Sequence, residues 1–333
     1  MKGWFYTCFK YFMRFVLKLY FKRIKIEGIE NVPRDMPLLV TPNHQNAFLD
    51  PVIVGAFIPL TLHFLTRADV FNRWTTPIMK LVNMMPIYRI RDGYSKLSLN
   101  DAVFETCKEI FKERKSILIF AEGNHGEHHY LRPLTKGAAR IALQSQQEVA
   151  EDLMVLPVGI NFFDHQSPQS SVLLVFGKPI AIKNYTQNPN KQEAIVLNEI
   201  RETISEGMKS TLVLPENTED YEFRRNAIFK EENAHLSFQE LRDIEILDPK
   251  KRKRKKHRIA RILNPLPYYL IGKKIAKTED VVFHSTIKFV QGLIMFPLWW
   301  CLIFFLLYFL VGIHIAGLAV VVMIMGLFYS YQS

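Results

Sequence analysis

The stretch PLLVTPNHQNAFLDPVIVGAFI, residues 37–58, joins two apolar runs through a polar loop. The first run predicts a buried strand over 37–41, and the second predicts a helix over 47–58. His44 and Asp50 stand between them, six positions apart. A histidine can take a proton from a hydroxyl when a carboxylate fixes its tautomer, but such a pair also occurs in ordinary turns. The pair alone leaves both interpretations open.

The alternation of apolar runs continues on both sides of this stretch, over residues 24–185. Further strands are predicted at 61–66, 116–121, 154–161 and 171–177, and further helices at 72–82, 95–113 and 135–150. Strands that alternate with helices in this way are typical of a sheet with helices on its faces. We therefore expect an α/β fold, a mixed sheet flanked by helices.

Two more polar clusters follow predicted strands, PIYRIRDG at 86–93 and FAEGNHGEHHYLRPLTKG at 120–137. Functional residues of α/β sheets gather at strand ends. The guanidinium of Arg89 suits a phosphate or carboxylate, although an ion pair with Asp92 is the alternative. Gly123 lets the backbone approach a ligand, and Glu122 can hold hydroxyls or orient a basic partner. Lys136, at a predicted helix start, could meet an anion.

The histidine-rich part of the third cluster does not predict a metal site. His125, His128 and His129 stand near Glu122 and Glu127, but their spacing matches no HExxH or comparable ligand pattern. A solvated polar loop is the simpler interpretation, and we expect no metal.

No residue of the chain has the sequence context of a catalytic nucleophile. A GxSxG elbow is missing from the sequence, and Cys8, Cys107 and Cys301 stand in no companion motif. These cysteines also have no paired spacing, which fits a reducing compartment. If His44 is catalytic, the nucleophile must come from the substrate, as an alcohol that His44 activates.

The C-terminal part has the length and composition of membrane helices. Residues 289–329 contain no Lys, Arg, Asp or Glu, and about 20 residues suffice to cross a bilayer. Gly312, His314 and Gly317 mark a reversal near the middle. We expect a transmembrane hairpin, roughly 290–310 and 314–331, with a single tilted span or a buried helix pair as alternatives.

A basic block precedes this region. Residues 250–261, KKRKRKKHRIAR, hold nine of the cations behind the net charge of +11, which leaves only +2 for the rest of the chain. No nucleic-acid-binding signature accompanies the block, so we expect anionic lipid and not nucleic acid as its partner. The positive-inside rule places this side of the hairpin in the cytoplasm.

The N-terminus predicts a different membrane element, over residues 1–23. Phe5, Phe12, Phe15 and Leu19 are among the apolar residues on one face of a helix, and the cations Lys10, Arg14 and Lys18 lie opposite. This pattern indicates an amphipathic helix at the membrane surface; a core helix with snorkelling cations is the alternative.

Taken in order, four blocks of the sequence resemble the glycerolipid acyltransferase family, which includes acylglycerol-phosphate and glycerol-phosphate acyltransferases. The blocks are Asn43-His44 with Asp50, MMPIY ending in Arg89, FAEGNHG with LTKGAARIAL, and VLPVGINF with Pro157. The resemblance departs from the family pattern in two places. Five residues separate His44 from Asp50 where the family commonly has four. Ala121 replaces the usual Pro, and Asn124-His125 replaces the usual Thr-Ser/Arg. These replacements bear on which acceptor head group the protein binds.

The resemblance implies direct acyl transfer, with His44 as general base and Asp50 orienting it. Backbone N–H groups would stabilise the oxyanion. It implies substrate-binding roles for Asn43, Arg89, Glu122, Gly123, Asn124, Lys136 and Pro157. The expected co-substrate is an acyl thioester, carried by coenzyme A or acyl carrier protein, with no other cofactor.

The implied reaction is acylation of lysophosphatidate to phosphatidate. Glycerol 3-phosphate, or an N-acyl amino-acid lipid, is an alternative acceptor, and a non-catalytic membrane-anchored lipid-binding protein is the alternative from another class. The implied organisation is a surface helix (1–23), a catalytic domain (24–185), a polar helical extension (186–249), a basic juxtamembrane segment (250–288) and the hairpin (289–331). We expect it in the inner or cytoplasmic membrane, with the catalytic domain facing the cytoplasm.

Overall fold

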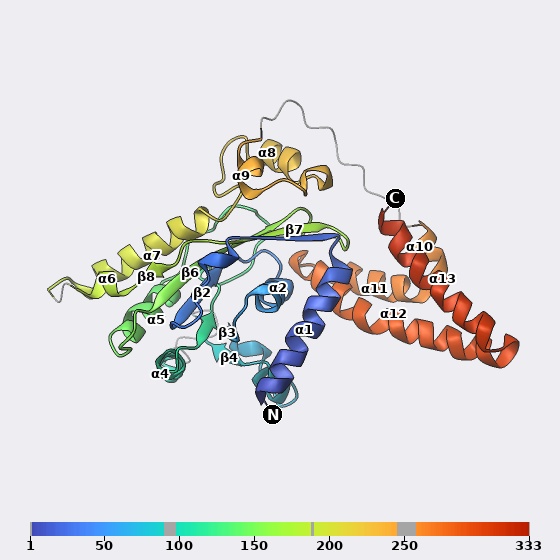
Figure 1. Cartoon of the computed structure of the whole chain (residues 1–333), viewed down its shortest axis with the longest axis horizontal. Helices are drawn as coiled ribbons and strands as arrows, with labels where there is room; N and C mark the ends of the chain where they lie inside the picture. Colours follow the sequence, from blue (N-terminus) through green and yellow to red (C-terminus); the bar gives the residue numbers. More distant parts are fainter. Residues whose placement is uncertain (1, 90–97, 188–189, 245–257, 333) are drawn as a thin grey trace.

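An eight-stranded mixed sheet forms the centre of the computed structural model, which describes residues 2–89, 98–187, 190–244 and 258–332 (Figure 1). The order across the sheet is β1 (Arg23–Glu27), β7 (Ser171–Phe176), β6 (Met154–Phe162), β2 (Leu38–Pro42), β5 (Ser116–Leu118), β3 (Leu62–Arg67) and β4 (Met84–Ile87), and β8 (Ile180–Ala181) pairs with β6. The run from β6 to β4 is parallel, whereas β7 and β8 lie antiparallel to β6. The predicted mixed α/β sheet is confirmed.

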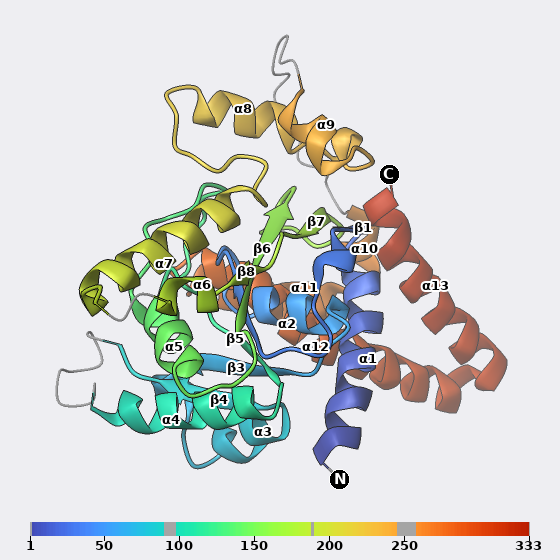
Figure 2. The ribbon, with the colours of Figure 1, turned by 60° about the vertical axis from the view of Figure 1, so that its left-hand side comes forward.

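Helices cover both faces of the sheet (Figure 2). α1 (Lys2–Tyr20) and α2 (Leu49–Phe57) pack on one face, and α4 (Leu99–Lys112), α5 (Gly137–Gln146) and α7 (Glu193–Lys209) pack on the other. Successive strand residues point to opposite faces, so in β2 the side chains of Leu38 and Val40 join the first layer and Leu39 joins the second. Burial on both faces explains why the central strands read as continuous apolar runs.

The region after the sheet is helical in the residues that the structure describes. It contains α6 (Lys183–Thr186), α7, α8 (Tyr221–Ile228) and α9 (Phe238–Arg242). Ile200, Ile204 and Met208 of α7 are buried against the sheet. α8 and α9 pack over β7 through a small separate core that includes Val175 and Tyr221. At least α7 therefore belongs to the body of the α/β domain.

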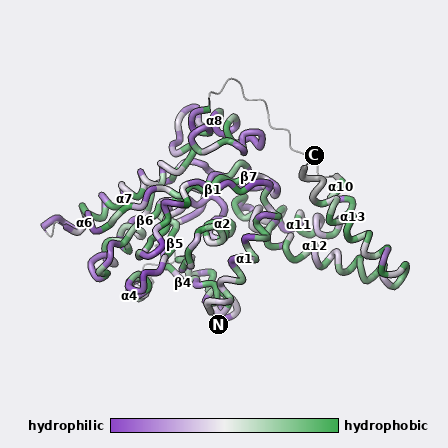
Figure 3. The backbone as a smooth tube through the Cα atoms, in the orientation of Figure 1, coloured by the Kyte–Doolittle hydropathy of each residue, from purple (hydrophilic) through white to green (hydrophobic). Residues whose placement is uncertain are grey.

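Four helices follow and extend away from the sheet (Figure 1): α10 (Arg258–Leu263), α11 (Pro265–Ala276), α12 (Val282–Val311) and α13 (Ile313–Gln332). Figure 3 shows that α12 and α13 are largely hydrophobic. Among the described residues, α12 is long and apolar enough to cross a bilayer, and the apolar helix over Ile313–Leu327 is shorter. Gly312, with φ of +86°, separates α12 from α13. The basic residues 250–257 lie outside the described residues.

α1 has apolar side chains on two sides. Tyr6 and Leu17 are buried against the domain, while Phe12 and Phe15 are 49% and 60% exposed. The expected strip of cations facing head groups is only partly present. Lys10 instead donates hydrogen bonds to two backbone carbonyls just after α2, 2.5 and 2.7 Å away, because α1 lies along the end of that helix.

Candidate active site

The loop of residues 43–48 leaves β2 at the carboxyl edge of the parallel strands. The ends of β5 and β6 flank it, because both strands pair with β2 in parallel. Ligands of α/β sheets bind at this edge. The topology therefore brings the first and third sequence clusters together.

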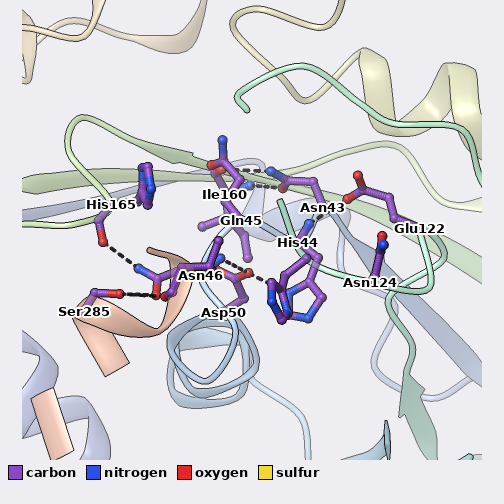
Figure 4. A network of polar contacts seen from close by, with 12 residues as sticks. Asn43, His44, Gln45, Asn46, Asp50, Glu122, Asn124, Ile160, His165 and Ser285 are labelled. Carbon is purple, nitrogen blue, oxygen red and sulfur yellow. Dashed lines mark hydrogen bonds and ion pairs between the residues drawn. The ribbon is translucent and has the colours of Figure 1, made fainter. Parts of the chain in front are cut away.

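His44 and Asp50 form a hydrogen-bonded pair (Figure 4). The Nδ1 of His44 lies 2.8 Å from Oδ2 of Asp50, whose side chain is fully buried in the first turn of α2. A carboxylate can only accept, so Nδ1 carries the proton and Nε2 keeps a lone pair. The five-residue separation is bridged by a turn in which Ala47 has φ of +24°. The longer loop thus still brings the two side chains into contact.

Two neighbours fix the imidazole. The ring stacks on Phe120, with centroids 3.8 Å apart, and meets the edge of His125 at 5.7 Å. The backbone N–H of His44 donates a 2.7 Å hydrogen bond to Oε1 of Glu122. Since both ring and backbone are held, His44 has little freedom to leave this orientation.

Glu122 also pairs with Arg132, which the sequence clusters contain but do not single out. Oε2 of Glu122 accepts from Nε of Arg132 at 2.8 Å and from its backbone N–H at 3.2 Å. The same guanidinium donates to the Asn124 side chain and, at 3.1 Å, to the carbonyl oxygen of His125. Burial raises the pKa of Glu122 to about 6, against the opposing charge of Arg132. Glu122 thus contacts both the backbone of His44 and the guanidinium of Arg132.

Both polar atoms of the Asn43 amide form hydrogen bonds within the fold. Its Nδ2 donates to the Ile160 carbonyl at 3.1 Å, and its Oδ1 accepts from the Ile160 N–H at 2.7 Å (Figure 4). Asn43 therefore ties the loop to β6 and does not present its amide to a ligand. Gly123 has φ of +76°, and a Cβ there would lie 2.9 Å from Cγ2 of Thr135, so the turn needs glycine.

Asn124 and His125 line a polar cavity of about 1290 Å³. The ring of His125 meets that of His44, which is not itself part of the cavity wall. Charged side chains of both signs line the cavity, among them Arg67, Asp164, Arg225 and Asp280. Burial lowers the pKa of His125, which favours its neutral form.

Of the seven expected binding residues, Asn124 lines this cavity, and the other six do not. Asn43, Glu122 and Gly123 lie in or beside the loops described above, and the remaining three lie elsewhere. Arg89 follows β4, while Arg67 at the end of the neighbouring β3 takes a place in the cavity wall. Lys136 is exposed directly before α5. Pro157 lies inside β6, opposite Thr41 of β2, where it packs in the sheet.

A second, apolar groove of about 1550 Å³ runs between α1, α11 and α12, and Phe15, Leu293 and Phe296 are among its walls. The groove and the polar cavity share Asp164 and Gln166. The polar cavity and the apolar groove therefore adjoin at these two residues. Within the described ranges, no three His, Cys, Asp or Glu side chains are arranged to hold a metal ion.

The family model described as Acyltransferase matches residues 23–161, which include His44, Asp50 and Glu122. The match covers less than half of the chain, and it identifies residues 23–161 as similar to that family.

A curated relative is 1-acyl-sn-glycerol-3-phosphate acyltransferase LPAT1, chloroplastic, of Arabidopsis thaliana. It is 26% identical over 215 residues, covering 59% of this chain and 54% of the relative. The chain thus spans about half the length of that relative. A solved structure that also matches is the 1-acyl-sn-glycerophosphate acyltransferase PlsC of Thermotoga maritima, with a TM-score of 0.42 and 19% identity over 60% of this chain and 78% of the other.

Proposed function

We propose that this protein transfers a fatty acyl group from an acyl thioester to the free hydroxyl of lysophosphatidate, forming phosphatidate, with His44 as the general base. The observation that carries this proposal is the 2.8 Å hydrogen bond between His44 and the buried carboxylate of Asp50. It leaves Nε2 as the proton acceptor, and the supporting context is the family match over residues 23–161.

The chemistry needs no nucleophile from the protein. Nε2 of His44 takes the proton of the acceptor hydroxyl while that oxygen attacks the thioester carbonyl carbon. The tetrahedral intermediate collapses by breaking the C–S bond, and the imidazolium returns its proton to the leaving thiolate. Asp50 stabilises the imidazolium charge in between. Coenzyme A or acyl carrier protein is the proposed carrier of the thioester.

A one-chain lipid fits the cavities better than glycerol 3-phosphate. In the polar cavity, Arg67 and Arg225 offer cations to an anionic head group, although each already pairs with a carboxylate, Asp69 and Glu222. The adjoining apolar groove can take an acyl chain. Glycerol 3-phosphate would leave the groove to the acyl chain of the donor alone, whereas lysophosphatidate can also place its own chain there.

We further propose that the protein works at an anionic membrane with its catalytic domain facing the cytoplasm. The exposed apolar side chains of α1 would lie in the interface, and α12 with α13 would enter the bilayer as a hairpin. This arrangement would place the open apolar groove within reach of membrane lipids.

The test is acyl transfer by the purified full chain in vesicles containing anionic lipid. Acyl-CoA and acyl carrier protein thioesters are each offered with lysophosphatidate, glycerol 3-phosphate or an N-acyl amino-acid lipid. We expect transfer to lysophosphatidate, and a loss of at least about 1000-fold in His44→Ala.

His235→Ala, which removes an exposed histidine, is the matched control and should keep full activity. Unchanged transfer by His44→Ala would overturn the general-base assignment. Binding of lysophosphatidate without transfer from either donor would favour the non-catalytic alternative.

A further inference from the structure

The first turns of α12 contact the loop that carries His44 and leads to Asp50 of α2. The Oγ of Ser285 donates a hydrogen bond to Oδ1 of Asn46, a residue 239 positions earlier (Figure 4). Both residues are buried, with 1% and 0% of their surface exposed. Polar groups in such a place must find their hydrogen-bond partners within the protein.

The orientation of this contact is fixed by a third partner. Nδ2 of Asn46 lies 2.8 Å from the carbonyl oxygen of His165, and only the NH₂ group of an amide can donate to a carbonyl. Oδ1 of Asn46 therefore faces Ser285, whose hydroxyl must be the donor. That hydroxyl has one hydrogen, and its other acceptor, the Val282 carbonyl, is 3.5 Å away.

Asn46 in turn holds Asp50. Its backbone N–H donates a 2.7 Å hydrogen bond to Oδ2 of Asp50, the oxygen that also accepts from His44 at 2.8 Å. Its carbonyl accepts from the N–H of Leu49 at 2.8 Å, where α2 begins. A series of hydrogen bonds thus links Ser285 to His44 through Asn46 and Asp50. The series enters Asn46 at its side chain and leaves it at its backbone N–H.

A second contact from the same region reaches the other side of His44. Oδ2 of Asp280, just before α12, lies 3.1 Å from Nε2 of His125. Phe283 meets the His125 ring edge-on, with centroids 5.1 Å apart, and His125 meets His44. The start of α12 therefore touches the neighbours of the imidazole on two sides.

We propose that Ser285 is a positioning residue for the reaction. It holds Asn46, and through Asn46 the carboxylate of Asp50, in the geometry that His44 requires. The site is then complete only when the start of α12 is docked against the α/β domain. This inference rests on the proposed function and adds to it a role for the helix that we place in the membrane.

The experiment compares Ser285→Ala with Thr286→Val in the full chain in detergent. Thr286, the next residue of α12, has a buried hydroxyl with no hydrogen-bond partner among the described residues, so it is a matched control. One readout is kcat and KM for the thioester. The other needs no substrate: diethyl pyrocarbonate labelling of His44 against pH, measured by mass spectrometry, reports the fraction of neutral imidazole.

In Ser285→Ala we expect kcat to fall about tenfold, as when a supporting hydrogen bond of a reactive histidine is lost, with little change in KM. The midpoint of His44 labelling should move down by about half a pH unit, because a less well aligned carboxylate stabilises imidazolium less. Thr286→Val should change neither. If Ser285→Ala does not fold, Ser285→Cys, of similar size but a weak donor, should give the same shifts.

Wild-type kcat and labelling midpoint in Ser285→Ala would overturn the inference, as would equal shifts in Thr286→Val. Failure of the proposed function looks different: no acyl transfer by the wild type with any donor. The labelling experiment would then still decide whether Ser285 positions the pair.

Discussion

Glu122 accepts a 2.7 Å hydrogen bond from the backbone N–H of His44, a residue 78 positions away in the sequence. Its other oxygen accepts from Arg132, and its side chain is only 3% exposed. Burial raises its pKa from 4.5 to about 6. The carboxylate that holds the backbone of the proposed base is therefore itself a group that titrates just below neutral pH.

This shift predicts a pH dependence of stability. Between pH 4.5 and about 6 the folded protein retains a proton on Glu122 that the unfolded chain has released. Raising the pH through this window therefore lowers the free energy of unfolding, by up to about 2 kcal/mol, and the effect is constant outside it. Denaturant unfolding of the full chain in detergent at a series of pH values measures it.

Glu122→Gln is the control for this titration. The glutamine side chain cannot ionise, so the fall in the free energy of unfolding between pH 4.5 and about 6 should disappear. It should also lower the stability at neutral pH by about 3 kcal/mol, because Arg132 loses its buried partner. A variant with the same pH slope as the wild type would show that another group is responsible.

Arg132→Lys tests whether a forked cation is needed beside the proposed base. The guanidinium of Arg132 contacts Glu122, Asn124 and His125 at once, which one ammonium group cannot do. We expect kcat to fall about 100-fold through misplacement of this loop, with the fold retained. Arg140→Lys, at an exposed position on α5, should leave kcat unchanged; equal loss in both variants would refute the role.

The sequence predicts the central sheet well, because buried strands must be apolar on both faces. It misses the edge strands β1 and β4, because RIKIE alternates charged and apolar residues and MMPI is too short to read. The sequence also places the first and third polar clusters at the ends of predicted strands. These features depend on local pattern and on general topology.

The roles of individual polar side chains are harder to predict. Asn43 precedes His44 and suggests a ligand contact, yet its partner is the backbone of Ile160, 117 positions later. Asn46 and Ser285 carry no local signal at all, since their contact exists only once α12 is docked. Tertiary partners far away in the sequence decide such roles.

Asn43→Ala distinguishes the two interpretations of that residue. Removing the amide leaves the N–H and carbonyl of Ile160 buried without these partners, so we expect the free energy of unfolding to fall by about 3 kcal/mol. The acceptor KM should be unchanged in the folded fraction. Thr41→Val removes only a 3.4 Å contact from Thr41 in β2 to the carbonyl of Leu156 in β6, and it should cost less than about 1 kcal/mol. A raised KM with wild-type stability would instead favour ligand binding by Asn43.

The exposed apolar side of α1 predicts contact with lipid, which a probe on Cys8 can detect. Cys8 is exposed on α1, and burial raises the pKa of Cys107 to about 12, so a Cys301→Ser variant should react with a thiol-specific fluorophore at Cys8. In vesicles we expect blue-shifted emission and quenching by brominated acyl chains, because a surface helix buries its apolar side ~5–10 Å into the interface.

The control places the fluorophore on α4, through Glu105→Cys in a chain that also lacks Cys8. Emission from this position should remain that of an aqueous probe. Equal quenching at both positions, or none at either, would contradict a membrane-surface location for α1.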